Sequence, residues 1–142
     1  MFPPTRGERN NNPFDLMGEA IPWDGLADPP VDDKGYCVFT TAPFGLRAGF
    51  LDLLNAWHRD GLRTIAALVA HFAPRAAGND VVAYVADVSA RVGLRPDAPL
   101  DLSRAGNLLE LGRAFIRHEQ GRCIYAEAEL AQAVAQALAA LI

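Results

Sequence analysis

Residues 108–121, with the sequence LLELGRAFIRHEQG, combine a helical apolar pattern with a glutamate that interrupts it. Leu108, Leu111 and Phe115 recur every three to four residues, so they share one face of a helix. Four residues after Phe115, the same face reaches Glu119. The pattern therefore predicts a buried helix whose last turn carries a carboxylic acid on its apolar face.

The position of Glu119 favours the protonated form of its carboxyl group. The last turn of a helix lies at the negative end of the helix dipole, which disfavours a carboxylate by about 0.3–1 kcal/mol. Partial burial acts in the same direction, so both effects raise the pKa. A carboxylic acid that keeps its proton near neutral pH is suited to general acid catalysis. In the alternative, the helix end emerges into water and Glu119 is an ordinary exposed residue.

Helical patterns continue through most of the chain after residue 40. Five helices are predicted, over residues 41–59, 64–72, 80–92, 102–121 and 126–141. Thr41 followed by Pro43 is typical of a helix start. Gly93 and Gly121 are typical of helix ends. The predicted fold class is therefore mainly α.

The first 40 residues differ from the rest of the chain. They hold six of the ten prolines and an asparagine run, which predicts loops and turns. Residues 36–40 are rich in β-formers and predict a short strand, with part of residues 14–24 as the candidate partner in a β-hairpin. We expect a single domain over residues 1–142, with a loop and β lobe at 1–40 and a helical lobe at 41–142.

Composition argues against several classes of protein. A chain of 142 residues with 51% hydrophobic and 21% charged residues is typical of a globular domain. The net charge of −4 argues against a nucleic-acid partner. Glu127 and Glu129 interrupt the apolar C-terminal stretch, so we expect no membrane insertion. The opening MFPPTRGERNNN lacks the apolar core of a signal peptide, so none is expected.

Other candidate residues are less well suited to chemistry. Glu8 is a second candidate acid, but its two flanking arginines lower its pKa. Cys123 has no evident partner base, and His118 is expected at the surface or behind the glutamate. Two distant cysteines do not make a metal site, so no metal or cofactor is expected, and whether Cys37 and Cys123 pair stays open.

The asparagine run at residues 10–12 is a candidate binding loop. Asparagine side chains present both donors and acceptors, which suit the hydroxyl and acetamido groups of a sugar chain. The same side chains also hydrogen-bond to their own backbone in turns, so an ordinary turn is the alternative.

Several motifs in order along the chain resemble one protein family. They are R-N-N-N-P at residues 9–13, A-P-F-G-L-R-A at 42–48, T-I-A-A-L-V-A-H-F-A-P at 64–74 and I-R-H-E-Q-G at 116–121. The combination resembles a family of small bacteriophage and prophage proteins, often described as virion structural proteins, and it spans Arg6 to about Leu130. The resemblance implies a protein associated with the virion, or one held in the bacterial cytoplasm before delivery to the periplasm.

Two segments also resemble enzymes of the lysozyme superfamily. Residues 114–121, followed by Tyr125, are similar to the helix end that carries the catalytic glutamate of lytic transglycosylases. Residues 11–13 and 36–39 are similar to blocks of bacterial glucosaminidases, but in the reverse order along the chain. The resemblance therefore implies a circularly permuted lysozyme-like domain, in which Glu119 is the catalytic acid.

The same resemblance implies a substrate and the residues that bind it. The expected activity is that of a phage-type peptidoglycan glycosidase or lytic transglycosylase, with the glycan strand of peptidoglycan as partner. Asn11 and Asn12 would hold the sugar, and Tyr84 and Tyr125 would form the aromatic walls of the groove. The alternative is a catalytically inactive virion structural or assembly protein with the same fold, which binds other virion proteins.

Two features bear on whether the chain is active. Relatives have P-G-N where this chain has Pro13-Phe14-Asp15, which removes a glycine and replaces an amide by a carboxylate. Glycoside hydrolysis usually needs a second carboxylate, and none of Asp15, Asp24 and Asp32 stands out as that group. Single-acid chemistry, with a hydroxyl or acetamido group of the substrate as nucleophile, fits the sequence better.

Overall fold

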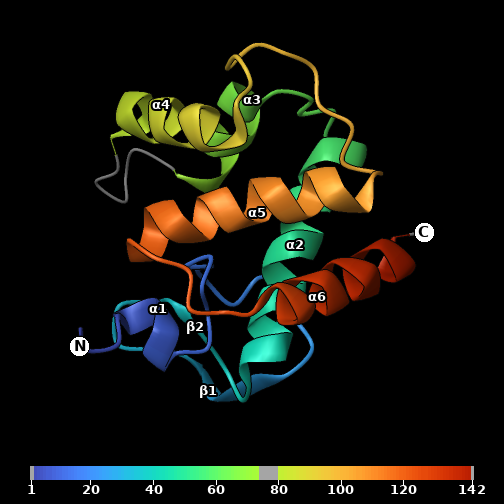
Figure 1. Ribbon diagram of the computed structural model, residues 1–142. Coiled ribbons are helices and arrows are strands. Elements are labelled where there is room, and N and C mark those ends of the chain that lie inside the picture. The colour runs from blue at the N-terminus through green and yellow to red at the C-terminus, as the bar shows by residue number, and fades with distance from the viewer. Residues whose placement is uncertain (1, 74–79, 142) are drawn as a thin grey trace.

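The computed structural model describes residues 2–73 and 80–141 and places a small two-stranded sheet beside a group of helices (Figure 1). The helices of the described residues are α1 (Arg6–Arg9), α2 (Ala42–His58), α3 (Ile65–Phe72), α4 (Val81–Val92), α5 (Ala105–Gln120) and α6 (Glu127–Ala140), and the strands are β1 (Leu26–Val31) and β2 (Cys37–Phe39). The chain is therefore mainly α with a small N-terminal β lobe, as predicted, and it has one short helix, α1, more than expected.

The ends of the longer helices follow from single residues. The side chains of Thr64 and Asp80 accept hydrogen bonds from backbone N–H groups in the first turns of α3 and α4. Gly93 and Gly121 end α4 and α5 in the left-handed conformation, with φ values of 80° and 77°. These helices therefore begin and end within three residues of the predicted positions.

Two elements of the N-terminal lobe differ from the prediction. Helix α1 begins with a capping box, in which the Thr5 hydroxyl accepts from the Glu8 N–H and the Glu8 carboxylate accepts from the Thr5 N–H. The main partner of β2 is β1, with which it pairs antiparallel, and this partner was not predicted. The predicted partner, within residues 14–24, makes a smaller contribution on the other side: Met17 and Tyr36 form an isolated antiparallel bridge, and the Cys37 N–H donates to the Leu16 carbonyl at 2.8 Å. Strand β1 tolerates its two prolines because it lies at the edge of a two-stranded sheet.

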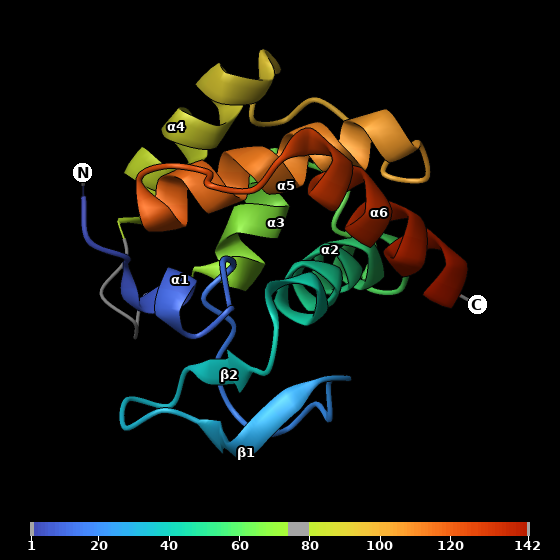
Figure 2. The same ribbon diagram turned by 60° about the horizontal axis from the view of Figure 1, so that its bottom comes forward.

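The N-terminal lobe and the C-terminal end of α5 lie on the same side of the molecule in both ribbon views (Figures 1 and 2). Helix α5 packs against α4 and α6 and contacts α2. At that contact Gly112 faces the ring of Phe50, and a Cβ at residue 112 would overlap it. Phe14 inserts beside Gly49 in the same way, with its ring 5.3 Å from that of Phe50. The loop that carries Phe14 is therefore fixed to the helical core.

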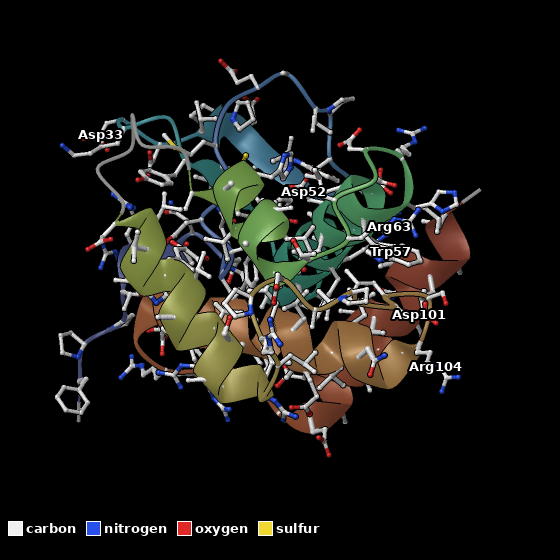
Figure 3. All side chains as sticks on the ribbon, turned by 90° about the horizontal axis from the view of Figure 1, so that it is seen from above. Asp33, Asp52, Trp57, Arg63, Asp101 and Arg104 are labelled. Carbon is white, nitrogen blue, oxygen red and sulfur yellow. The ribbon has the colours of Figure 1, made fainter. Side chains whose placement is uncertain are left out.

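A second set of contacts lies at the C-terminal end of α2, where Figure 3 labels Trp57 and Arg63. The indole N–H of Trp57, on α2, donates to the Leu100 carbonyl at 2.9 Å. The guanidinium of Arg63 lies 4.1 Å from the centre of the Trp57 ring, in a cation–π contact. These contacts fix the segment that enters α5.

Two further features bear on the expectations from composition. Within residues 2–73 and 80–141, no helix has both the length and the apolar character needed to cross a bilayer. Both cysteines are free thiols, with Cys37 buried and Cys123 half-buried.

Candidate active site at the end of α5

A pocket of about 470 Å³ lies between the N-terminal lobe and the helical lobe. Its titratable lining residues are Arg6, Asp15, Tyr36, Asp52, His71 and Glu119. Met17, Ile21 and Trp23 add an apolar wall. The pocket therefore brings together residues from α1, α2, α3, α5 and the two loops on either side of β1.

Glu119 is half-buried at the C-terminal end of α5, on the face that the apolar pattern predicted. Phe115 and Ile116, one turn earlier, are fully buried. Burial and the adjacent carboxyl of Asp15 raise the pKa of Glu119 to about 8, against a smaller lowering effect of Tyr84 and Arg6. The Glu119 carboxyl is therefore mostly protonated at neutral pH and faces a pocket rather than open water.

Asp15 supplies the second carboxyl of the pocket. Its side chain is half-buried, lines the same pocket as Glu119 and interacts with the Glu119 carboxyl strongly enough to affect its pKa. Burial raises the pKa of Asp15, while interactions with Glu119 and Gln120 and the charge of Arg6 oppose that rise. The interaction between the two carboxyls raises the pKa of Glu119 and opposes the rise in the pKa of Asp15, so the two groups titrate as a pair.

Within residues 13–15, Phe14 and Asp15 line the pocket. Asp15, not Phe14, adopts the left-handed backbone, with φ 52°. Aspartate tolerates this region better than most residues, and Phe14 is buried in the core. The segment Pro13-Phe14-Asp15 therefore puts a ring in the core and a carboxyl in the pocket.

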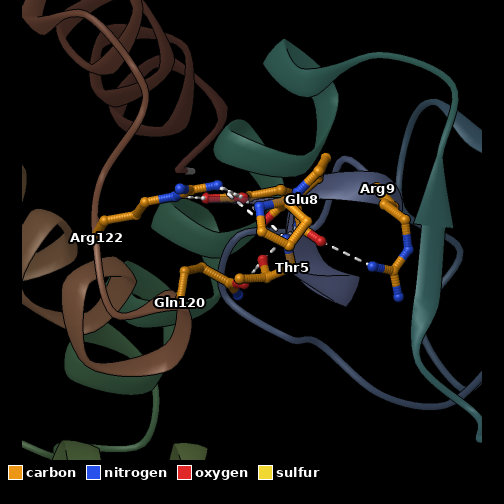
Figure 4. A network of polar contacts seen from close by, with 7 residues as sticks. Thr5, Glu8, Arg9, Gln120 and Arg122 are labelled. Carbon is orange, nitrogen blue, oxygen red and sulfur yellow. Dashed lines mark hydrogen bonds and ion pairs between the residues drawn. The ribbon is translucent and has the colours of Figure 1, made fainter. Parts of the chain in front are cut away.

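Gln120, the residue after the glutamate, ties this loop to α1 and α5. Its side-chain N–H donates to the Pro13 carbonyl at 2.9 Å, and its amide oxygen accepts from the Thr5 hydroxyl (Figure 4). Gly7 leaves room for this amide, because a Cβ at residue 7 would overlap it. The amide of Gln120 therefore sets how the loop approaches the end of α5.

Glu8, the second candidate acid, forms a structural ion pair instead. Its buried carboxylate accepts two hydrogen bonds from Arg122, at 2.6 and 3.0 Å, and one from the Thr5 N–H at 2.9 Å (Figure 4). The hydrogen bonds from Arg122 lower the pKa of Glu8 despite its burial. Glu8 stays ionised and does not line the pocket, so it is not a proton donor there.

Tyr84 is buried in the helical core rather than exposed in a groove wall, which corrects the expectation for this residue. It is fully buried, with its ring 5.5 Å from that of Phe115 and 3.8 Å from that of His118. Tyr125 is half-buried and does not line the pocket. Burial raises its pKa to about 12. Neither tyrosine is placed to stack on a sugar in this pocket.

The side chains of Asn11 and Asn12 hydrogen-bond to backbone groups within the N-terminal lobe. The expectation that these two residues hold a sugar is therefore not supported. Asn12 is fully buried, and its amide bonds to the Leu16 N–H and to the carbonyls of Leu16 and Cys37, each at 3.0 Å. Asn11 donates to the Phe39 carbonyl at 3.1 Å. Neither residue lines the pocket, because both amides are used to hold the loop against β2.

The other aspartates considered from the sequence lie elsewhere. Asp24 faces Arg47 at 3.6 Å, and Asp32 accepts a hydrogen bond from the Asn10 amide at 2.9 Å. Neither lines the pocket. Of the three aspartates considered, Asp15 is therefore the one that the fold brings to Glu119.

Several pocket residues were not found from the sequence. The Arg6 guanidinium lies 3.5 Å from the centre of the Tyr36 ring. His71 Nε2 lies 3.8 Å from Asp52 Oδ1, and this carboxylate raises the pKa of His71. Trp23 is the half-buried indole of the apolar wall. No local motif joins these residues, since each comes from a different segment.

The described part of the chain contains no cluster of three or more His, Cys, Asp or Glu side chains that could hold a metal ion. His118, expected at the surface or behind the glutamate, is half-buried and holds Asp87 through its Nδ1 at 2.7 Å. The Cys123 thiol contacts the Tyr125 carbonyl at 3.8 Å. Neither His118 nor Cys123 lines the pocket.

Comparison with known proteins does not assign this site. The chain matches no protein-family model, and no curated protein sequence is significantly similar to it. A functional assignment therefore rests on the geometry of the pocket.

Proposed function

We propose that this protein cleaves glycosidic bonds of a peptidoglycan strand, with Glu119 as general acid. The observation that carries the proposal is a half-buried carboxyl whose pKa is raised to about 8 and which faces a pocket of about 470 Å³. At pH 7 such a group is about nine-tenths protonated. Proton donation to a leaving oxygen requires this state of a carboxyl group.

The electrostatics of the two carboxyls favour single-acid chemistry. Glycoside hydrolysis by a pair of carboxyls separates them by about 5–5.5 Å in retaining enzymes and about 6.5–9.5 Å in inverting enzymes, and the second group acts in its ionised form. Asp15 lines the same pocket as Glu119, and its interaction with the Glu119 carboxyl raises the pKa of Glu119. We therefore assign to Asp15 the role of the partner that keeps Glu119 protonated.

The single-acid reaction uses a group of the substrate as nucleophile. Glu119 gives its proton to the glycosidic oxygen as the bond from that oxygen to the anomeric carbon breaks. A hydroxyl of the same sugar then bonds to the anomeric carbon, and its proton returns to the Glu119 carboxylate. The acid is thereby regenerated without a second carboxylate or a cofactor.

The choice of a glycan as substrate has two supports. One is the resemblance of residues 114–121 to the catalytic helix end of lytic transglycosylases. The other is the half-buried Trp23 in the pocket wall, since an indole offers a flat apolar face and a polar edge, both of which a pyranose can contact. We assign to Trp23 the stacking role that the sequence suggested for Tyr84 and Tyr125.

The test is cleavage of purified peptidoglycan by the wild-type protein and two variants. Glu119→Gln keeps the shape of the side chain and removes the acid, and it should reduce turnover at least 100-fold. Glu110→Gln makes the same change at an exposed position of the same helix and should retain activity. Mass spectrometry of the products distinguishes the pathways, because the intramolecular reaction yields products one water lighter than hydrolysis does.

Two results would contradict the proposal. Equal turnover by the wild type and Glu119→Gln would exclude Glu119 as the acid. No turnover by the wild type, together with stable binding to another virion component, would favour the structural or assembly protein.

A further inference from the structure

Arg6 brings a guanidinium group to the wall of the pocket from the first turn of α1. Within residues 2–73 and 80–141, this guanidinium forms no ion pair, and its Nε is buried without a hydrogen-bond partner. A buried N–H group without a partner costs stability, so the position of Arg6 calls for an explanation.

The carboxylates near Arg6 do not pair with it. Its positive charge affects the pKa values of Asp15, Asp32 and Glu119, so these groups lie in its surroundings. The Asp32 oxygens instead accept hydrogen bonds from the Asn10 amide and from the Lys34 N–H, each at 2.9 Å. The donors of Arg6 are therefore left for a group that the described residues do not supply.

The Arg6 guanidinium is held in place without such a partner. It lies 3.5 Å from the centre of the Tyr36 ring, in a cation–π contact. The Tyr36 N–H in turn donates to Asp32 at 3.0 Å, and the ion pair of Glu8 with Arg122 fixes α1 (Figure 4). A guanidinium positioned in this way loses little conformational entropy when a ligand binds.

The charges of the pocket favour one place for an anionic group. A guanidinium offers a planar fork of N–H donors that matches the two oxygens of a carboxylate. Asp15 and Asp52 repel an anion from other parts of the pocket, although His71 lies 3.8 Å from Asp52 and offsets part of its charge. A ligand that carries a carboxylate is therefore expected to place it on Arg6, with its neutral part beside the acidic residues.

We propose that Arg6 is a specificity-determining residue, whose guanidinium binds a carboxylate of the ligand. The choice of carrier rests on the proposed function, since the stem peptides of a peptidoglycan strand bear free carboxylates and a polymer of N-acetylglucosamine bears none. Arg6 thus selects a glycan that carries acidic peptides over a neutral glycan.

The test compares two probes that differ in charge. One is N-acetylmuramyl-alanyl-glutamate, and the other is the same molecule with its carboxyl groups converted to amides. In calorimetric titrations at pH 7, the wild-type protein should bind the acid about tenfold more tightly than the amide, because hydrogen bonds between charged groups are the stronger kind. Arg6→Gln removes the cation and should bind the two probes equally.

Arg9→Gln is the matched control. Arg9 lies on the same short helix, but it is exposed, donates to the Pro4 carbonyl at 2.8 Å and does not line the pocket. This variant should keep the preference of the wild type for the acid. Arg6→Lys keeps the charge without the planar fork, so its preference should be intermediate.

A second measurement observes Arg6 itself. The Nε–H signal of Arg6 in ¹H–¹⁵N spectra is identified by its loss in Arg6→Lys, and it should shift when the acid is added but not when the amide is added. If Arg6→Gln does not fold, this signal and Arg6→Lys decide. Equal binding of both probes by the wild type, a preference that persists in Arg6→Gln, or no binding of the acid would overturn the proposal.

The inference on Arg6 can fail separately from the proposed function. N-acetyl-alanyl-glutamate, which has the carboxylates and no sugar, distinguishes the two. If it shifts the Arg6 signal but peptidoglycan is not cleaved, the carboxylate site stands and the proposed function fails. If peptidoglycan is cleaved through Glu119 while the acid and the amide bind equally, the proposed function stands and the role of Arg6 fails.

Discussion

The clearest consequence of a buried neutral carboxyl is a stability that falls as the pH rises. The pKa of Glu119 is about 8 in the folded chain, against a model value of 4.5. Between these values the folded protein holds a proton that the unfolded chain has released, so folding is favoured by acid. This contribution is complete below about pH 4.5 and is lost as the pH rises through 8.

The size of the effect follows from the shift. A shift from 4.5 to about 8, at about 1.4 kcal/mol per pH unit, sets an upper limit of about 5 kcal/mol. Glu119 is only half-buried and the pocket is open to water, so we expect about 2–3 kcal/mol. That loss is a large fraction of the stability of a typical domain.

Urea unfolding of the wild type and Glu119→Gln from pH 4.5 to 9 measures this effect. The wild type should lose about 2–3 kcal/mol of unfolding free energy across the range relative to Glu119→Gln, which cannot titrate at this position. Parallel pH profiles for the two proteins would refute the reasoning, because they would place Glu119 in an environment that does not shift its pKa.

Three further predictions concern the frame of the site and its substrate. Gly7→Ala should destabilise the protein by about 1–3 kcal/mol in urea unfolding, because the new methyl group overlaps the hydrogen-bonded side-chain amide of Gln120. The control Gly106→Ala, which adds a methyl group in open space on α5, should stabilise the protein by about 0.5–1 kcal/mol. Arg122→Ala should destabilise the protein at pH 7 and much less at pH 3, because the pKa of Glu8 is lowered by this pair, and the loss should vanish in a Glu8→Gln background. Trp23→Ala should raise KM for a peptidoglycan fragment more than it lowers kcat, and equal binding by both proteins in calorimetry would contradict the stacking role.

Much of the helical lobe could be predicted from the sequence because its signals are local. Thr64 and Asp80 cap their helices, and Gly93 and Gly121 end theirs, through contacts within one turn of chain. The apolar pattern before Glu119 also placed that residue correctly, since helical geometry alone brings it to the buried face.

The contacts that build the pocket could not be predicted in this way. Asp15 and Glu119 line one pocket although helices α2, α3, α4 and most of α5 lie between them in the sequence, and no spacing rule reports such a long-range arrangement. The role of the asparagine run could not be predicted, because amide side chains can hydrogen-bond either to a sugar or to the backbone. In the structure Asn12 is buried and its amide binds backbone groups. Strand β1 was missed because its prolines usually exclude a strand, except at an edge.

Helix α1 is a different case, because its signal is local and lies in the sequence. The spacing of Thr5 and Glu8 is that of a capping box, and the structure contains this box. The motif places Glu8 on a short helix, where its carboxylate accepts a hydrogen bond from the Thr5 N–H. A carboxylate used in this way is favoured in its ionised form, so the motif itself argues against Glu8 as a proton donor.

The direct measurement is the midpoint of the Glu119 carboxyl resonance in the wild-type protein, recorded by ¹³C NMR between pH 3 and 10 and assigned by its loss in Glu119→Gln. A protonated acid in the pocket predicts a midpoint near the value of about 8 that burial and Asp15 impose. A midpoint near 4.5, the model value of a solvated glutamate, would contradict the account and leave the pocket without an acid.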